Sequence, residues 1–149
     1  MGTSYKGTNR ERQALDTYIK MIRATESVTS RVNMYLTTCN LTESQFNVLD
    51  ALYHLGPLSQ KELGKKLLKS GGNITMVIDN LEKSKYVRRR KVKKDRRLYN
   101  VHLTAKGKDQ IEKILPDLVN EVVKEMKVLS QSEQVELQKL CKKIGLRKQ

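Results

Sequence analysis

The stretch that is most informative about the fold is residues 88–104, which read RRRKVKKDRRLYNVHLT. The first ten of them, Arg88 to Arg97, carry eight positive charges against one acidic group, Asp95. The next residues alternate in polarity, which predicts a strand with one apolar face formed by Tyr99, Val101 and Leu103. We therefore predict a β-hairpin with strands at 86–92 and 97–103 and a turn at 93–96. A cationic hairpin of this kind is suited to holding guanidinium groups against a polyanion.

Two short helices with strong start signals precede the hairpin. Thr42-Glu43-Ser44-Gln45 is a capping-box pattern, and Leu41 and Phe46 occupy the hydrophobic-staple positions around it. Ser59-Gln60-Lys61-Glu62 repeats the pattern between Leu58 and Leu63. The first helix is expected to end near His54, before Gly56-Pro57, and the second to span about 59–68.

A further helix is expected to begin at Ser70 and to bury Ile74, Val77, Ile78 and Leu81. The short break at 68–70 predicts the tight turn of a helix-turn-helix unit. Gly71 and Gly72 fall in the first turn, where each costs roughly 1 kcal/mol relative to Ala in a helix interior. Two interpretations remain open: the glycines keep bare backbone close to a partner, or they are loop residues that merely start the helix.

Long amphipathic helices are predicted on both sides of this middle region. Apolar residues recur at helical spacing over 12–38, and a second stripe follows the capping residue Thr104, with a kink expected at Pro116. Ser130-Gln131-Ser132-Glu133 is a third capping box, and it opens a last helix that ends at Gly145. A domain this small cannot cover the helix at 12–38, so part of its apolar face is expected to meet a second subunit.

Composition narrows the possible functions. The chain has 149 residues, enough for one domain with a real core, and its formal charge of +14 attracts nucleic acid or an anionic membrane surface. No apolar run approaches the roughly 20 residues needed to span a bilayer. Cys39 and Cys141 are far apart and no secretory leader is evident, so we expect reduced thiols in the cytoplasm. The sequence contains no phosphate loop, nucleophile elbow or metal-ligand cluster, so we expect neither an enzyme nor a cofactor.

The order of elements and several motifs resemble the MarR family of bacterial transcription regulators over about residues 15–144. The most specific pieces are Leu58-Ser59-Gln60-Lys61-Glu62-Leu63, the run Ile74–Lys83 (ITMVIDNLEK), Asp95-Arg96-Arg97, and Leu103-Thr104-Ala105-Lys106-Gly107. The resemblance implies a mainly α fold with a small β-hairpin wing, that is, a winged helix-turn-helix with N- and C-terminal helical dimerisation arms. Residues 1–149 would form one domain, with a DNA-binding lobe at about 42–104 and a dimerisation region at 11–38 and 105–146. Where the family has a glycine before the wing, this chain has Lys85, which we expect to adopt a less comfortable backbone conformation.

The resemblance also implies which residues contact double-stranded DNA. The recognition helix would use Ser70, Gly72, Asn73, Thr75 and Met76 in a major groove, although Asn73 and Thr75 at a helix start can also simply face water. In the wing, Arg97 would enter the minor groove, positioned by a bidentate pair with Asp95. Lys93, Lys94 and Arg96 would contact phosphate, as would Ser59, Gln60 and Lys61 at a helix start, while residues 88–91 are partly a solvated face.

A regulatory signal is expected but not identified by the sequence. Family members bind small aromatic or phenolic ligands between the arms and the lobes, and Tyr35, Tyr53 and His54 are the candidates for lining such a site. Cys39 is a candidate oxidant sensor, and an inert buried thiol is the competing interpretation. For each tyrosine and for the histidine, a purely structural role is the favoured interpretation over a sensory one.

These observations favour a dimeric repressor that binds a palindromic operator and is released by a small-molecule or oxidative signal. The alternative is a nonspecific or architectural nucleic-acid-binding protein, for which the net charge alone would suffice. The base-facing residue types on the predicted recognition helix favour the first hypothesis, because an architectural protein needs only positive charge and apolar wedges.

Overall fold

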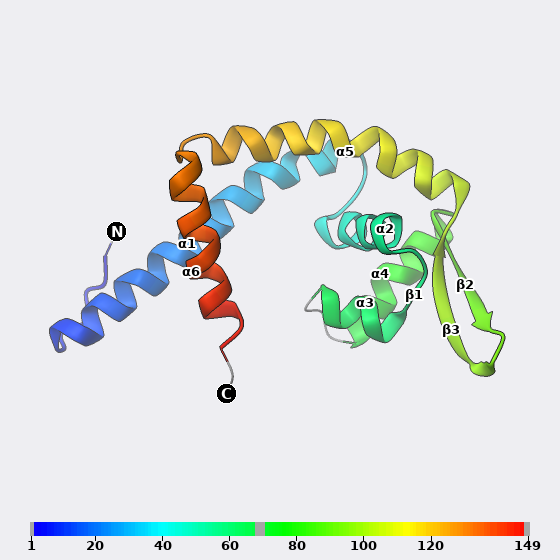
Figure 1. Cartoon of the computed structure of the whole chain (residues 1–149), viewed down its shortest axis with the longest axis horizontal. Coiled ribbons are helices and arrows are strands. Elements are labelled where there is room, and N and C mark those ends of the chain that lie inside the picture. The colour runs from blue at the N-terminus through cyan, green and yellow to red at the C-terminus, as the bar shows by residue number, and fades with distance from the viewer. Residues whose placement is uncertain (1, 68–70, 148–149) are drawn as a thin grey trace.

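The computed structural model describes residues 2–67 and 71–147 and shows a helical lobe with a β-hairpin, flanked by long helices (Figure 1). In chain order the elements are α1 (Asn9–Thr38), α2 (Glu43–Leu55), β1 (Leu58–Ser59), α3 (Gln60–Lys66), α4 (Gly71–Lys83), β2 (Val87–Val92), β3 (Asp95–Leu103), α5 (Ala105–Met126) and α6 (Gln131–Gly145). The mainly α fold with a winged helix-turn-helix lobe is therefore confirmed.

The helix starts follow the capping signals in the sequence. The side chains of Thr42, Ser59 and Ser130 each accept from the N3 backbone, and the N3 side chain accepts in return from the capping residue. A fourth capping box, Thr8 with Glu11, starts α1 at Asn9. The prediction that the helix begins near residue 12 is therefore wrong, because Thr8 caps the helix N-terminus and apolar periodicity alone does not show that cap. The expected cap at Ser70 lies outside the described residues.

The sheet has three strands, one more than predicted, in the order β1-β3-β2 and antiparallel throughout. The two residues of β1 pair with Val101 and Asn100, a contact between segments that lie far apart in the sequence. The turn of the hairpin is shorter than predicted, since β3 begins at Asp95 and leaves only Lys93 and Lys94 between the strands. The core covers only the inner part of the predicted apolar face: Val101 is buried, whereas Tyr99, nearer the hairpin tip, is 46% exposed.

The core lies where the lobe meets α1 and α5, and it is aliphatic apart from Phe46. Its buried members come from every helix except α6, from both long strands and from the segment between α1 and α2: Leu36, Leu41, Phe46, Val48, Leu49, Leu52, Leu63, Ile74, Ile78, Leu81, Val87, Val101, Ile111, Ile114 and Leu118. Helix α5 packs against both α1 and α2, and it arches over the lobe in Figure 1. This helix therefore connects the wing to the arm formed by α1 and α6.

The junction between α4, the wing and α5 explains the Leu-Thr-x-x-Gly motif. The Tyr86 carbonyl accepts from the Thr104 backbone N–H (3.0 Å) and from the Thr104 hydroxyl (3.1 Å). A Cβ on Gly107 would lie 2.1 Å from that same carbonyl oxygen, so only glycine allows the close approach. Lys85 has φ 63°, which confirms the expected uncomfortable conformation at the position where the family has glycine.

Candidate nucleic-acid interface

Helix α4 divides into three faces. Ile74, Ile78 and Leu81 are buried in the core. Asn73, Met76 and Asn80, spaced three and four residues apart, lie on one exposed face, and the Met76 residue is 59% exposed. Between these two faces lies a polar line formed by Gly71, Thr75, Asp79 and Glu82. The exposed face carries amides and a thioether, groups that suit base edges in a DNA groove. Asn80 lies in the third turn of α4, beyond the two turns in which DNA contacts were predicted.

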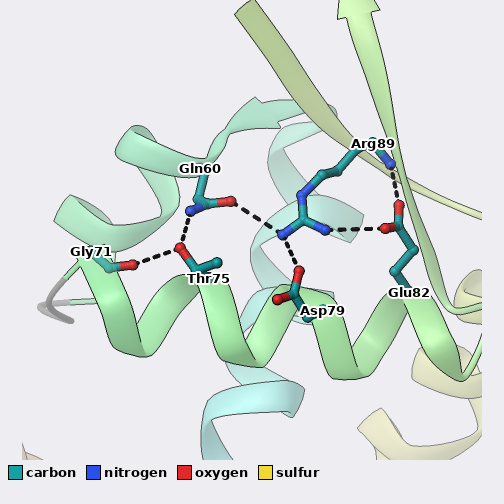
Figure 2. Close-up of polar contacts among 6 residues, drawn as sticks. All are labelled: Gln60, Gly71, Thr75, Asp79, Glu82 and Arg89. Atoms are coloured by element: carbon teal, nitrogen blue, oxygen red, sulfur yellow. Dashed lines mark hydrogen bonds and ion pairs between the residues drawn. The ribbon is translucent and has the colours of Figure 1, made fainter.

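The polar line of α4 is occupied by a cluster of side chains drawn in Figure 2. The Arg89 guanidinium, from β2, lies 2.6 Å from Asp79 Oδ1 and 3.1 Å from Glu82 Oε1, and its backbone N–H donates to Glu82 Oε2 at 2.9 Å. Arg89 Nη2 also donates to Gln60 Oε1 at 3.4 Å. The Gln60 amide donates to the Thr75 hydroxyl, which in turn donates to the Gly71 carbonyl at 2.9 Å. We call Gln60, Thr75, Asp79, Glu82 and Arg89 the Arg89 cluster.

The Arg89 cluster includes two residues that were predicted to contact DNA. Gln60 donates to the Thr75 hydroxyl and accepts from Arg89, so both predicted side chains have partners within the lobe. Arg89 itself was assigned in part to a solvated charged face, and it proves to point inward. The signal that identifies it is strand alternation: Val87 is buried, so Arg89, two residues on, shares its face.

The tip of the wing carries a second group of charged side chains, which is exposed and separate from the Arg89 cluster. Lys93, Lys94, Arg96 and Arg97 are all exposed at the hairpin tip. Asp95 accepts from the Arg97 backbone N–H at 3.0 Å, and its two oxygens lie 3.3 Å from Arg97 Nε and 3.5 Å from Nη2. The backbone bond and then the side-chain bond from Arg97 lower the pKa of Asp95. The predicted Asp95–Arg97 pair is therefore present, and it orients a guanidinium whose side chain is 90% exposed.

The predicted phosphate contacts at the start of α3 comprise an exposed side chain and a side chain that caps the helix. Lys61 is exposed, and Ser59 caps the helix with its backbone N–H donating to Glu62 at 2.8 Å. That backbone bond and the Ser59 side-chain bond lower the pKa of Glu62, which places a carboxylate at this helix start. Gly72 is exposed, and a Cβ there would meet nothing within 4 Å.

Of the four sensor candidates, Tyr35 and Tyr53 contact α5, whereas His54 and Cys39 have partners within or next to their own helices. The Tyr35 hydroxyl donates to Asp117 at 3.3 Å, and the Tyr53 hydroxyl donates to Glu112 at 3.2 Å, so α1 and α2 each contact a carboxylate of α5. Burial, together with its neighbours Cys39 and Asp117, raises the pKa of Tyr35 to about 12. His54 Nδ1 lies 3.1 Å from Asp50 within α2, and Cys39 is a half-buried free thiol.

Among residues 2–67 and 71–147, none of the helices has the length and apolar character of a membrane span. Within the same residues no group of three or more His, Cys, Asp or Glu side chains is placed to hold a metal ion.

The order of α2, α3 and α4 followed by the hairpin of β2 and β3 is that of a winged helix-turn-helix, a class of DNA-binding fold. The MarR family's sequence model matches residues 41–99. The HTH-type transcriptional regulator MhqR of Bacillus subtilis is 31% identical over 134 residues, which cover 90% of this chain and 92% of that protein. The chain therefore belongs to the MarR family and is a DNA-binding transcription regulator.

Solved structures show the same fold. The MarR family transcriptional regulator Sco3205 from Streptomyces coelicolor, solved in complex with DNA, has a TM-score of 0.85 at 19% identity, covering 95% of this chain and 90% of that one. NadR, solved in complex with 4-hydroxyphenylacetate, has a TM-score of 0.74 at 23% identity, covering 99% of this chain and 100% of that one.

Proposed function

We propose that this protein is a cytoplasmic homodimeric repressor that binds a near-palindromic operator. Each subunit would place α4 in a major groove and its wing in the adjoining minor groove. The observation that carries the proposal is the exposed amide and thioether face of α4 beside the cationic hairpin tip. Asn side chains bind adenine bidentately and apolar groups contact the thymine methyl, so this face supports sequence reading rather than charge attraction alone.

Within this proposal the DNA contacts are revised from the sequence prediction. Asn73, Met76 and Asn80 would contact base edges, and Arg97 would enter the minor groove, where narrow A·T-rich segments concentrate negative potential. Lys61, Lys93, Lys94 and Arg96 would contact phosphate, with Gly72 allowing close approach of the backbone. Ser59 remains a candidate phosphate contact through its position at the α3 start.

Dimerisation is supported by the apolar surface that the arms leave uncovered. Exposed apolar residues follow α1, the second half of α5 and α6: Leu15, Tyr18, Ile22, Met34, Val119, Val122, Val123, Val135, Leu137, Leu140 and Ile144. A groove of about 410 Å³ between α1 and α6 is lined by Met21, Val28, Met126, Leu140 and Ile144, among others. Apolar surface of this extent marks a protein interface. A two-fold dimer would then present two identical recognition helices to a palindrome.

The small-molecule signal we propose is an aromatic or phenolic compound acting at the junction of α1, α2 and α5. Tyr35 and Tyr53 each hold a carboxylate of α5 through one hydroxyl, so a phenol that takes over either bond would alter how α5 lies on the lobe. NadR binds 4-hydroxyphenylacetate, a phenol, and it shares this fold. An oxidative signal through Cys39, a half-buried free thiol at the C-terminal end of α1, is the second candidate.

The function is tested by selecting duplexes from a random pool with the wild-type protein and measuring affinity for a selected duplex and a scrambled one. We expect one near-palindromic sequence to be enriched, with half-site centres about 10 base pairs apart. Binding should fall steeply with salt while preference for the selected duplex persists. Enrichment of no sequence, with equal affinity for scrambled duplex at moderate salt, would establish the architectural alternative. Addition of 4-hydroxyphenylacetate tests the effector separately. We expect the compound to release the wild-type protein from the selected duplex, and to release Tyr35→Phe or Tyr53→Phe less effectively.

A further inference from the structure

Arg89 connects three elements of the DNA-binding lobe, namely β2, α4 and α3. Its guanidinium, from β2, contacts Asp79 and Glu82 of α4 and Gln60 at the start of α3. Gln60 extends the connection to Thr75, one turn before Asp79 on α4 (Figure 2). One side chain thus holds the wing, the recognition helix and the preceding helix in a single arrangement.

The geometry separates Arg89 from the residues proposed to touch DNA. Its side chain is 22% exposed, whereas that of Arg97 is 90% exposed. Its partners Asp79 and Glu82 lie on the polar line of α4, beside the face that carries Asn73, Met76 and Asn80. Planar guanidinium groups bind carboxylates in a fixed orientation, so the pairs at 2.6 and 3.1 Å restrict rotation of α4 relative to β2.

We propose that Arg89 is a specificity-determining positioning residue: it fixes the angle between α4 and the wing, so that both can contact their grooves at once. Arg89 touches no DNA in this account. When its contacts are lost, each element still attracts DNA, but the base contacts of α4 and the minor-groove contact of Arg97 no longer form together. Discrimination between sequences therefore falls more than attraction to DNA of any sequence. This inference rests on the proposed function, because it requires a preferred sequence.

Charge changes of opposite sign distinguish positioning from simple electrostatics. Arg89→Gln removes a positive charge, Asp79→Asn removes a negative one, and Arg89→Lys leaves the charge unchanged while losing the fork that joins three partners. Electrostatics alone predicts weaker, stronger and equal binding, respectively, to all duplexes. Positioning predicts reduced discrimination in all three variants.

The matched control is Arg90→Gln. Arg90 is the next residue of β2 and is exposed on the opposite face of the strand, so this variant loses the same charge without touching the Arg89 cluster. It should weaken binding to selected and scrambled duplexes by the same factor.

The experiment measures the affinity of each full-length variant for a duplex selected by the wild-type protein and for its scrambled counterpart, over a series of salt concentrations. We expect the ratio of the two affinities to fall about tenfold in Arg89→Lys and Asp79→Asn, comparable to losing one base contact. Arg90→Gln should keep the wild-type ratio. Circular dichroism checks that each variant is folded, and if Arg89→Gln unfolds, the other two cluster variants carry the test.

Three results would overturn the inference. One is a wild-type ratio in both Arg89→Lys and Asp79→Asn. Another is a salt slope that drops by about one in Arg89→Gln with the ratio intact, which would make Arg89 a phosphate contact. The third is a loss of discrimination in Arg90→Gln as large as that in Arg89→Lys. Failure of the wild-type protein to select any sequence would instead overturn the proposed function.

Discussion

Replacement of Gly107 by alanine tests the junction that holds the wing against α5. A Cβ at this position would lie 2.1 Å from the Tyr86 carbonyl oxygen, about 1.3 Å closer than the 3.4 Å at which ordinary van der Waals contact begins, and 2.8 Å from Leu103 Cδ1. The carbonyl cannot retreat freely, because it accepts from both the backbone N–H and the hydroxyl of Thr104. The clash must therefore be relieved by moving backbone.

The expected cost follows from these contacts. Overpacking in a well-packed region costs roughly 1–3 kcal/mol, and each weakened hydrogen bond adds about 1 kcal/mol. The better helix propensity of alanine offsets at most about 1 kcal/mol of this. A net loss of about 2–4 kcal/mol in the free energy of unfolding corresponds to a melting temperature lower by roughly 5–15 °C for a chain of this length.

The assay is thermal unfolding followed by circular dichroism, at one protein concentration because dimerisation shifts the midpoint. The matched control is Gly72→Ala in α4, where a Cβ would meet nothing within 4 Å, so its midpoint should stay the same or rise slightly. If Gly107→Ala melts within about 1 °C of the wild type, less than roughly 0.5 kcal/mol is at stake and the close approach does not constrain the fold.

Three further predictions concern the wing, the arms and pH. Arg97→Ala should reduce affinity for a selected duplex by about 1–3 kcal/mol and relax preference in its A·T-rich flank, whereas Lys94→Ala should weaken binding to all sequences and reduce the salt slope by about one; a reversed pattern would show that the wing roles are misassigned. Leu140→Glu, on the exposed face of α6, should produce a folded monomer at micromolar concentration in sedimentation, and a stable dimer would rule out this face as the interface. Burial, and after it the charge of Arg90, lowers the pKa of His102 in the folded chain below its ordinary 6.5. As the pH drops below 6.5 the unfolded chain therefore binds a proton more readily than the folded one, and the free energy of unfolding decreases. His102→Gln should flatten this part of the pH profile of stability, and an unchanged profile would contradict the assignment.

The helices were predictable because their signals are local. A capping box needs only four consecutive residues, and those at Thr42, Ser59 and Ser130 each mark a helix start in the structure. The strand β1 was not predictable, because two residues carry no periodicity and their partners on β3 lie about forty positions along the chain. Local patterns thus specify where helices and strands begin, whereas the pairing of strands is seen only in the folded lobe.

The candidate interface was predictable in its parts but not in its internal contacts. The pairing of Asp95 with Arg97 could be proposed from a spacing of two residues. The capture of Arg89 by Asp79 and Glu82 depends on how β2 crosses α4, which no local pattern encodes. For the same reason the hydrogen bonds that link Gln60 to Thr75 and to Arg89 were not predicted.

We propose that α4 and the wing contact DNA in two different grooves of one operator. This arrangement is tested by footprinting the wild-type protein on a selected duplex, with one reagent that probes the major groove and one that probes the minor groove. We predict two major-groove protections about 10 base pairs apart, flanked by minor-groove protections that disappear in Arg97→Ala while the major-groove ones remain. A single asymmetric protection, or minor-groove protection unaffected by Arg97→Ala, would contradict the account.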